Sequence, residues 1–259
     1  MLPAVLTPML TIARYTVLEA LRNRLVWLLL LIVLAAVGIS GFLGAVALTE
    51  SRQVQAALLA AGLRFAAVFL MVVFVVTSML REANDKGVEL LLALALPRAA
   101  YLLGKLCGFA ALALLPALLF GALCLFFAPW DQCLLWGVSL VCELWIAAAF
   151  SLMCVLSFNQ PLPALAATFG FYLLARAIGS LQLIAHGPFN SHAASQRLIG
   201  AALDVIAAVL PRLDQFTRTD WLVYHGGDAA ALAGIAVQTV LCVALLTAVA
   251  LFDLYRKRF

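Results

Sequence analysis

Three charged residues stand inside long apolar runs of the sequence, and they are the side chains best placed to do chemistry. They are Arg64, Glu143 and Arg176. A lone charge in the apolar interior of a membrane costs roughly 2.5–3.5 kcal/mol on insertion scales, so each residue needs a partner or water. A carboxylate and a guanidinium form a strong ion pair. The second guanidinium then leaves a positive excess that attracts an anionic group.

The depth of the three residues within their runs indicates which of them meet. At a rise of about 1.5 Å per residue, Glu143 lies roughly 15 Å into its run. Arg176 reaches about the same depth in the following run, which travels in the opposite direction, and Arg64 is only slightly shallower. We therefore expect Glu143 and Arg176 to pair, with Arg64 facing the same cavity. The alternative is that Arg64 extends to the outer headgroups and the other pair is purely structural.

Motifs of other chemistry are absent from the sequence or fit it poorly. It contains no GxxxxGK[S/T], HExxH or GxSxG, so no ATP hydrolysis or other enzyme activity is expected of this chain. Its six cysteines include no CxxC pair, and its histidines (His186, His192, His225) fit no metal-site spacing, so no cofactor is predicted. Cys124 and Cys133 fall near one turn, where they either form a disulfide or remain buried thiols.

The composition places these residues in a membrane protein. The 259 residues are 66% hydrophobic and 11% charged, whereas soluble domains are roughly 45–50% apolar and about 25% charged. Lipid must therefore cover most of the surface. The net charge of +4 does not indicate nucleic acid, because the basic residues cluster at the ends of apolar runs and form no continuous face.

Six apolar runs are long enough to cross a membrane, which takes about 20 residues. Spans are predicted at about 25–49, 56–80, 106–130, 133–156, 161–185 and 229–252. They use most of the chain, so residues 1–259 are expected to form a single transmembrane domain. Three glycines in the first span (Gly38, Gly41, Gly44) favour close helix packing, either within the chain or at a dimer seam.

The basic residues predict the orientation. They concentrate before the first span, between the second and third spans, and at the C-terminal end of the chain. With six spans these three places lie on one side, which the positive-inside rule assigns to the cytoplasm. The exception is the outer segment 186–228, which contains Arg197, Arg212 and Arg218. We expect a bacterial inner-membrane protein with both termini in the cytoplasm.

Three shorter helices complete the predicted all-α fold. Thr11–Arg24 is expected to be an amphipathic helix along the inner surface, with Leu10, Ala13, Val17 and Leu21 on its apolar face. The cytoplasmic segment 82–103 contains a short apolar helix that stops at Pro97, followed by a second helix leading into the third span. Ser195–Leu210 is too short to span and is expected to be re-entrant.

The cytoplasmic segment also carries a family resemblance. It contains Gly87-Val88-Glu89-Leu90-Leu91-Leu92, Pro97-Arg98 and Leu103-Gly104-Lys105. With the opening stretch 12–24, these motifs resemble the permeases of type-2 ABC exporters, and most the branch linked to maturation of multicopper enzymes. The resemblance extends over the whole chain. The family often has Thr where Val88 stands and Ser-Arg where Arg98-Ala99 stands, so no role of a Thr or Ser is carried over.

The resemblance implies a set of partners. Two copies of such a permease, as a homodimer or with a related permease, work with two separate ATPase subunits that bind ATP and Mg²⁺. The segment 82–105 would supply the coupling helix that docks on the ATPase, and the residues assigned to this contact are Asp85, Gly87, Glu89, Pro97 and Arg98. The re-entrant helix would line the outer gate.

Other interpretations remain open from the residues alone. Composition alone favours a solvated loop with an interfacial helix for the segment 82–105. For the chain as a whole, one alternative is a secondary transporter or channel that uses its intramembrane charges, and another is a membrane assembly factor that transports nothing.

Overall fold

The computed structural model describes residues 2–46, 51–84, 97–185 and 194–256, and in these ranges the chain is helical with no strand. Six of the helices are long and apolar enough to cross a membrane. They are α2 (Leu25–Val46), α3 (Ser51–Asn84), α5 (Arg98–Cys124), α6 (Trp130–Phe158), α7 (Pro161–Ala185) and α10 (Ala229–Arg256). The predicted all-α fold with six such helices is confirmed, and it is the architecture of a multi-pass membrane protein.

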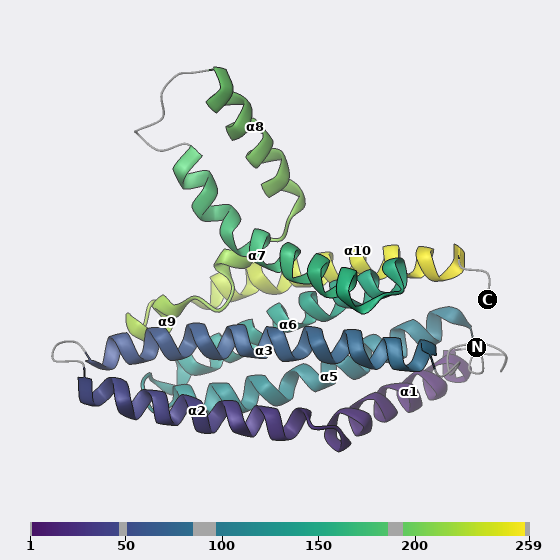
Figure 1. Cartoon of the computed structure of the whole chain (residues 1–259), viewed down its shortest axis with the longest axis horizontal. Helices are drawn as coiled ribbons and strands as arrows, with labels where there is room; N and C mark the ends of the chain where they lie inside the picture. The colour runs from purple at the N-terminus through teal and green to yellow at the C-terminus, as the bar shows by residue number, and fades with distance from the viewer. Residues whose placement is uncertain (1, 47–50, 85–96, 186–193, 257–259) are drawn as a thin grey trace.

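The long helices lie side by side along the long axis of the molecule, with both chain termini at the same end (Figure 1). Successive spanning helices alternate in direction, as six spans with both termini on one side require. We refer to this end as the terminal end, and to the opposite one, where α2 ends and α3 begins, as the far end.

The helices differ from the predicted spans mainly at the third. α5 begins at Arg98, directly after Pro97, so the helix predicted after the proline and the third span are one continuous helix. The prediction that this span reaches Trp130 is wrong, because α5 ends at Cys124 and a turn follows. The turn is built from apolar residues, so nothing in their polarity marks the end of the helix.

α6 is the central helix of the bundle. It packs against α3, α5, α7 and α10, and it is the most buried of the six. Trp136, Leu140 and Leu144 on this helix are completely buried. A helix packed against four others can place a polar side chain away from both lipid and water, and α6 carries Glu143 on its buried side.

The N-terminal helix α1 (Leu2–Arg22) packs closely against the first half of α5. The contact depends on Gly104 and Gly108, which have the GxxxG spacing that lets helix backbones approach in membranes. A Cβ atom added at Gly108 would lie 2.7 Å from the Cβ of Thr16, and one at Gly104 would lie 3.0 Å from the carbonyl oxygen of Met9.

The side of α1 that packs on the protein is not its predicted apolar face. Thr16 and Ala20 are buried, whereas Leu10 is 61% exposed and Leu21 46% exposed. The glycines of α5 bring the two backbones close together at Ile12 and Thr16, so the side of α1 that carries these residues faces the protein. Leu10 and Leu21 are left facing outward.

The glycines of α2 behave differently from those of α5. A Cβ atom added at Gly38 or Gly41 would have no neighbour within 4 Å, so close packing within the chain is wrong for these two positions. The surroundings of Gly44 lie outside the described residues. The surface of α2 at Gly38 and Gly41 is therefore open.

The segment before α10 has two parts with different surroundings. The predicted short helix is present as α8 (Ala194–Val209), which packs on α7 and projects with the C-terminal part of α7 from the side of the bundle (Figure 1). The element that inserts between the spanning helices follows it. This insert, residues 211–223, contains η1 (Leu213–Gln215) and α9 (Thr219–Val223).

The insert is anchored by apolar side chains. Leu213, Phe216 and Trp221 are buried, with η1 on α7 and α9 on α3 and α6. Between its two short helices the backbone is irregular, and Thr217 has a positive φ of 42°. Backbone N–H and C=O groups in such a segment have no hydrogen-bond partners within a helix, so side chains of the bundle must supply those partners.

Candidate functional site: a buried polar network

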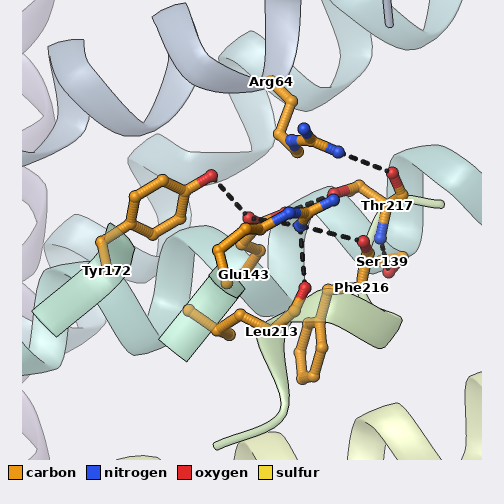
Figure 2. A network of polar contacts seen from close by, with 8 residues as sticks. Arg64, Ser139, Glu143, Tyr172, Leu213, Phe216 and Thr217 are labelled. Carbon is orange, nitrogen blue, oxygen red and sulfur yellow. Dashed lines mark hydrogen bonds and ion pairs between the residues drawn. The ribbon is translucent and has the colours of Figure 1, made fainter. Parts of the chain in front are cut away.

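Glu143 is the centre of a polar network in the interior of the bundle (Figure 2). Its side chain is completely buried. One carboxylate oxygen accepts hydrogen bonds from the Tyr172 hydroxyl at 2.9 Å and from Nη1 of Arg176 at 3.2 Å. The other accepts one from the Thr217 hydroxyl. Three donors leave this carboxylate well satisfied despite its burial.

Arg176 connects α7 to the insert. Besides Glu143, its Nη1 donates to the carbonyl oxygen of Leu213 at 2.8 Å and to that of Phe216 at 3.1 Å. These carbonyls belong to the irregular backbone around η1. Arg176 thus neutralises the buried carboxylate and also satisfies backbone that would otherwise be unpaired.

Thr217 is held from two sides. Its N–H donates to Oγ of Ser139 on α6 at 2.8 Å, and its carbonyl oxygen accepts from Nη1 of Arg64 on α3 at 3.1 Å. Ser139 and Glu143 are four residues apart and so lie on one face of α6. The insert is therefore fastened to α6 and α7 by one set of contacts and to α3 by another.

The structure brings together all three of the intramembrane charges. Arg176 pairs with Glu143, as their depths predict. Arg64 turns inward to Thr217 in the same network, so the alternative in which it extends to the outer headgroups does not hold. The network contains two guanidinium groups and one carboxylate, which gives it a net positive charge.

Three members of the network are missing from the sequence-based site. Tyr172 and Ser139 each stand four residues before a predicted charge, Arg176 and Glu143 respectively, and that spacing is a usable signal. No such sequence signal marks Thr217, because it lies in an irregular segment without helical periodicity.

Of the predicted coupling residues, Asp85, Gly87 and Glu89 lie outside the described residues, and Pro97 and Arg98 lie within them. Pro97 has an extended conformation (φ −63°, ψ 132°) immediately before α5. Arg98 donates to the carbonyl oxygens of Leu254 at 3.0 Å and Tyr255 at 3.3 Å. These are carbonyls of the last turn of α10, a favourable place for a cation.

Further polar contacts join the helices at the terminal end. Lys105 of α5 forms an ion pair with Glu82 of α3, and the side chains are 7% and 19% exposed. Glu19 of α1 accepts hydrogen bonds from the Ser78 hydroxyl of α3 at 2.9 and 3.0 Å. α1, α3, α5 and α10 are thus linked around the two ends of the segment 85–96.

Neither a metal centre nor a disulfide is found in the described part of the chain. No three His, Cys, Asp or Glu residues come together there in a metal-binding arrangement. Cys124 and Cys133 are buried free thiols. His225 is exposed, and His186 and His192 lie outside the described residues.

Comparison with known proteins adds no family assignment. The sequence matches no protein-family model and no curated protein.

Proposed function

We propose that this chain is the transmembrane permease subunit of an ATP-driven exporter, working as a dimer with two separate ATPase subunits that bind ATP and Mg²⁺. The permease itself catalyses no reaction. It lies in the bacterial inner membrane with both termini in the cytoplasm, and it moves its substrate outward by alternating access.

The observation that carries the proposal is the linkage of four helices around the segment 85–96. The Glu82–Lys105 ion pair joins the two helices that flank this segment, and Arg98, just after it, is bound to the last turn of α10. Glu19 joins α1 to α3 beside them. Motion applied to the segment by a docked ATPase is therefore transmitted to α3, α5 and α10 together. A solvated loop has no need of such anchoring.

The insert provides the second part of the mechanism. Alternating access needs an outer gate that is firmly closed in one state and released in the other. The insert is held by Ser139, Glu143 and Arg176 from α6 and α7, and by Arg64 from α3. Movement of α3 relative to α6 and α7 would break the Arg64 contact and the packing of α9 on α3, while the other set stays, and that separation would open the gate.

One observation favours a different class of transporter. A buried carboxylate beside two arginines is also what a proton- or ion-coupled secondary transporter uses. In that case transport follows an ion gradient and needs no ATPase. A membrane assembly factor, the remaining alternative, would show no substrate-stimulated ATP turnover.

The test is purification of the tagged chain from its native membranes, followed by identification of what accompanies it. We expect an ATPase subunit in a 2:2 complex, and ATP turnover in proteoliposomes. Glu89→Lys should reduce recovery of the ATPase while the permease still inserts. Asp228→Lys, an exposed reversal just before α10, is the matched control and should leave recovery unchanged.

Two results would refute the proposal. One is a chain that carries no ATPase from native membranes and transports in response to an ion gradient. The other is an ATPase complex that Glu89→Lys and Asp228→Lys affect equally, which would remove the coupling role of the segment.

A further inference from the structure

The polar network leaves one cation without an anionic partner. Glu143 already accepts three hydrogen bonds, and the guanidinium paired with it is that of Arg176. Arg64 donates to the neutral carbonyl oxygen of Thr217 and also interacts with the neutral side chain of Tyr172, and within the described residues its buried Nε has no hydrogen-bond partner. A buried guanidinium has five N–H donors and is stable only with acceptors for them.

An apolar groove lies beside this cation. It has a volume of about 340 Å³ and is lined by residues of α2, α3, the end of α5 with the turn after it, and α9. Gly41, Ala56 and Leu59 are among the residues that line it. Phe126, also part of the wall, is 81% exposed, so the groove opens toward the lipid.

The groove and the unpaired cation share two structural elements. Leu63 lines the groove and immediately precedes Arg64 in α3. Leu222 of α9 lines it from the other side, in the same insert as Thr217. Arg64 and Thr217 do not line the groove themselves, but each is close in the chain to a residue that does, so the positive charge of the network lies behind this part of the wall.

We infer that this site binds an acidic amphiphile, with its anionic group on Arg64 and its apolar chain in the groove. The inference rests on the proposed transport function and names the class of substrate. A carboxylate or phosphate supplies the acceptors that Arg64 lacks, and an alkyl chain fills a space whose lining is almost wholly apolar. The chain then points toward the far end, inverted relative to a lipid of the adjacent leaflet, as in a molecule captured during transfer.

The test is equilibrium binding of radiolabelled palmitate to the purified full chain in a maltoside detergent. We expect saturable binding that hexadecanol, with the same chain and no charge, does not displace. Arg64→Gln should weaken it by about tenfold or more, since a buried charged contact is lost. Arg64→Lys keeps the charge and loses the planar guanidinium, so it should bind palmitate more tightly than Arg64→Gln but less tightly than wild type, which separates loss of the anion contact from misfolding.

A second pair of variants tests the groove without touching the network. Gly41→Phe places a ring in the groove with no steric conflict at its Cβ, and it should abolish palmitate binding. Gly234→Phe is the matched control, because Gly234 on α10 has equally open surroundings and does not line the groove. It should bind like wild type.

Competitors identify the source of the anion. Displacement by dioleoyl phosphatidylglycerol but not by phosphatidylcholine supports an anionic phospholipid, and displacement by fatty acids alone supports a free carboxylate. The inference would be overturned if inorganic phosphate or hexadecanol displaced palmitate as well as the acidic amphiphiles do. It would also be overturned if neither Arg64→Gln nor Gly41→Phe changed the affinity for palmitate. No ATPase is present, so a failure here is distinguishable from failure of the exporter proposal.

Discussion

Arg176 on α7 and Glu143 on α6 form an ion pair at 3.2 Å, and the carboxylate has no exposed surface. Removing one partner of a buried pair leaves the other charge uncompensated, at a cost of about 3–5 kcal/mol. We predict that Glu143→Gln and Arg176→Gln each lower the folded yield and the melting temperature in detergent. The double variant should recover part of the loss, because the two residues interact.

An exposed pair on the insert provides the control for this experiment. Arg218 and Asp220 are 3.1 Å apart with side chains 52% and 58% exposed, and such pairs contribute about 0–1 kcal/mol. Neutralising either of them should leave the melting temperature nearly unchanged. Strict additivity of the Glu143 and Arg176 substitutions would show that the buried contact has no energetic role.

The Glu143–Arg176 pair could be predicted from the sequence, and the rest of the network could not. Helical rise and alternating span direction are enough to place Glu143 and Arg176 at one depth. The partner of both is Thr217, which belongs to an insert whose path depends on where Leu213, Phe216 and Trp221 find space between α3, α6 and α7. No periodicity encodes that path, so the sequence suggested α8 as the inserted element and not the residues after it.

Gly108 is expected to be essential for the position of α1. A Cβ there would lie 2.7 Å from the Cβ of Thr16 and 3.0 Å from the carbonyl oxygen of Ala13. Gly108→Val should therefore push α1 away, at about 1–3 kcal/mol, and speed tryptic cleavage after Arg14 in the purified protein. Gly62→Val on α3, where the added atoms meet open space, should digest at the wild-type rate. Equal digestion of the two variants would contradict the role of Gly108.

The face of α1 shows why helical periodicity alone can mislead in lipid. Leu10, Ala13, Val17 and Leu21 form an apolar stripe, and in water such a stripe marks the core-facing side. In a membrane the exterior is apolar too, so the positions where helix backbones can approach closely decide which side packs on protein. The informative signal is the Gly104/Gly108 spacing on α5, which places Ile12 and Thr16 of α1 at the contact.

The orientation is testable at both ends of the bundle. Gly87 and Phe259, although outside the described residues, and Gln160, between α6 and α7, should all report a cytoplasmic location in fusions to a topology reporter, following the basic-residue asymmetry. Ser191, also outside the described residues, and Gly226, just before α10, should report the periplasm. A periplasmic signal at Gly87 or Gln160 would invert the topology and remove the proposed ATPase contact.

The insert packs closely on α7 at Gly179. A Cβ atom added at Gly179 would lie 2.5 Å from Oδ2 and 3.0 Å from Cγ of Asp214, the central residue of η1. Asp has a short side chain whose own Cβ is already 3.5 Å away, so rotation of the carboxylate alone cannot accommodate a branched residue. A larger side chain at this position must displace η1 as a unit.

We therefore predict that Gly179→Val loosens the insert and leaves the six long helices intact. Displacing η1 lengthens the hydrogen bonds from Arg176 to the carbonyl oxygens of Leu213 and Phe216. Losing these hydrogen bonds costs about 1–3 kcal/mol of folding free energy for each buried acceptor. Trypsin should then cleave after Arg212 and Arg218 several times faster than in wild type, while helical content by circular dichroism is unchanged. Gly170→Val, on the same helix with open surroundings, is the control and should match wild type. If trypsin cleaves Gly179→Val no faster than Gly170→Val, the position of the insert does not depend on its packing against α7. The assignment of the insert as the outer gate then loses its structural basis.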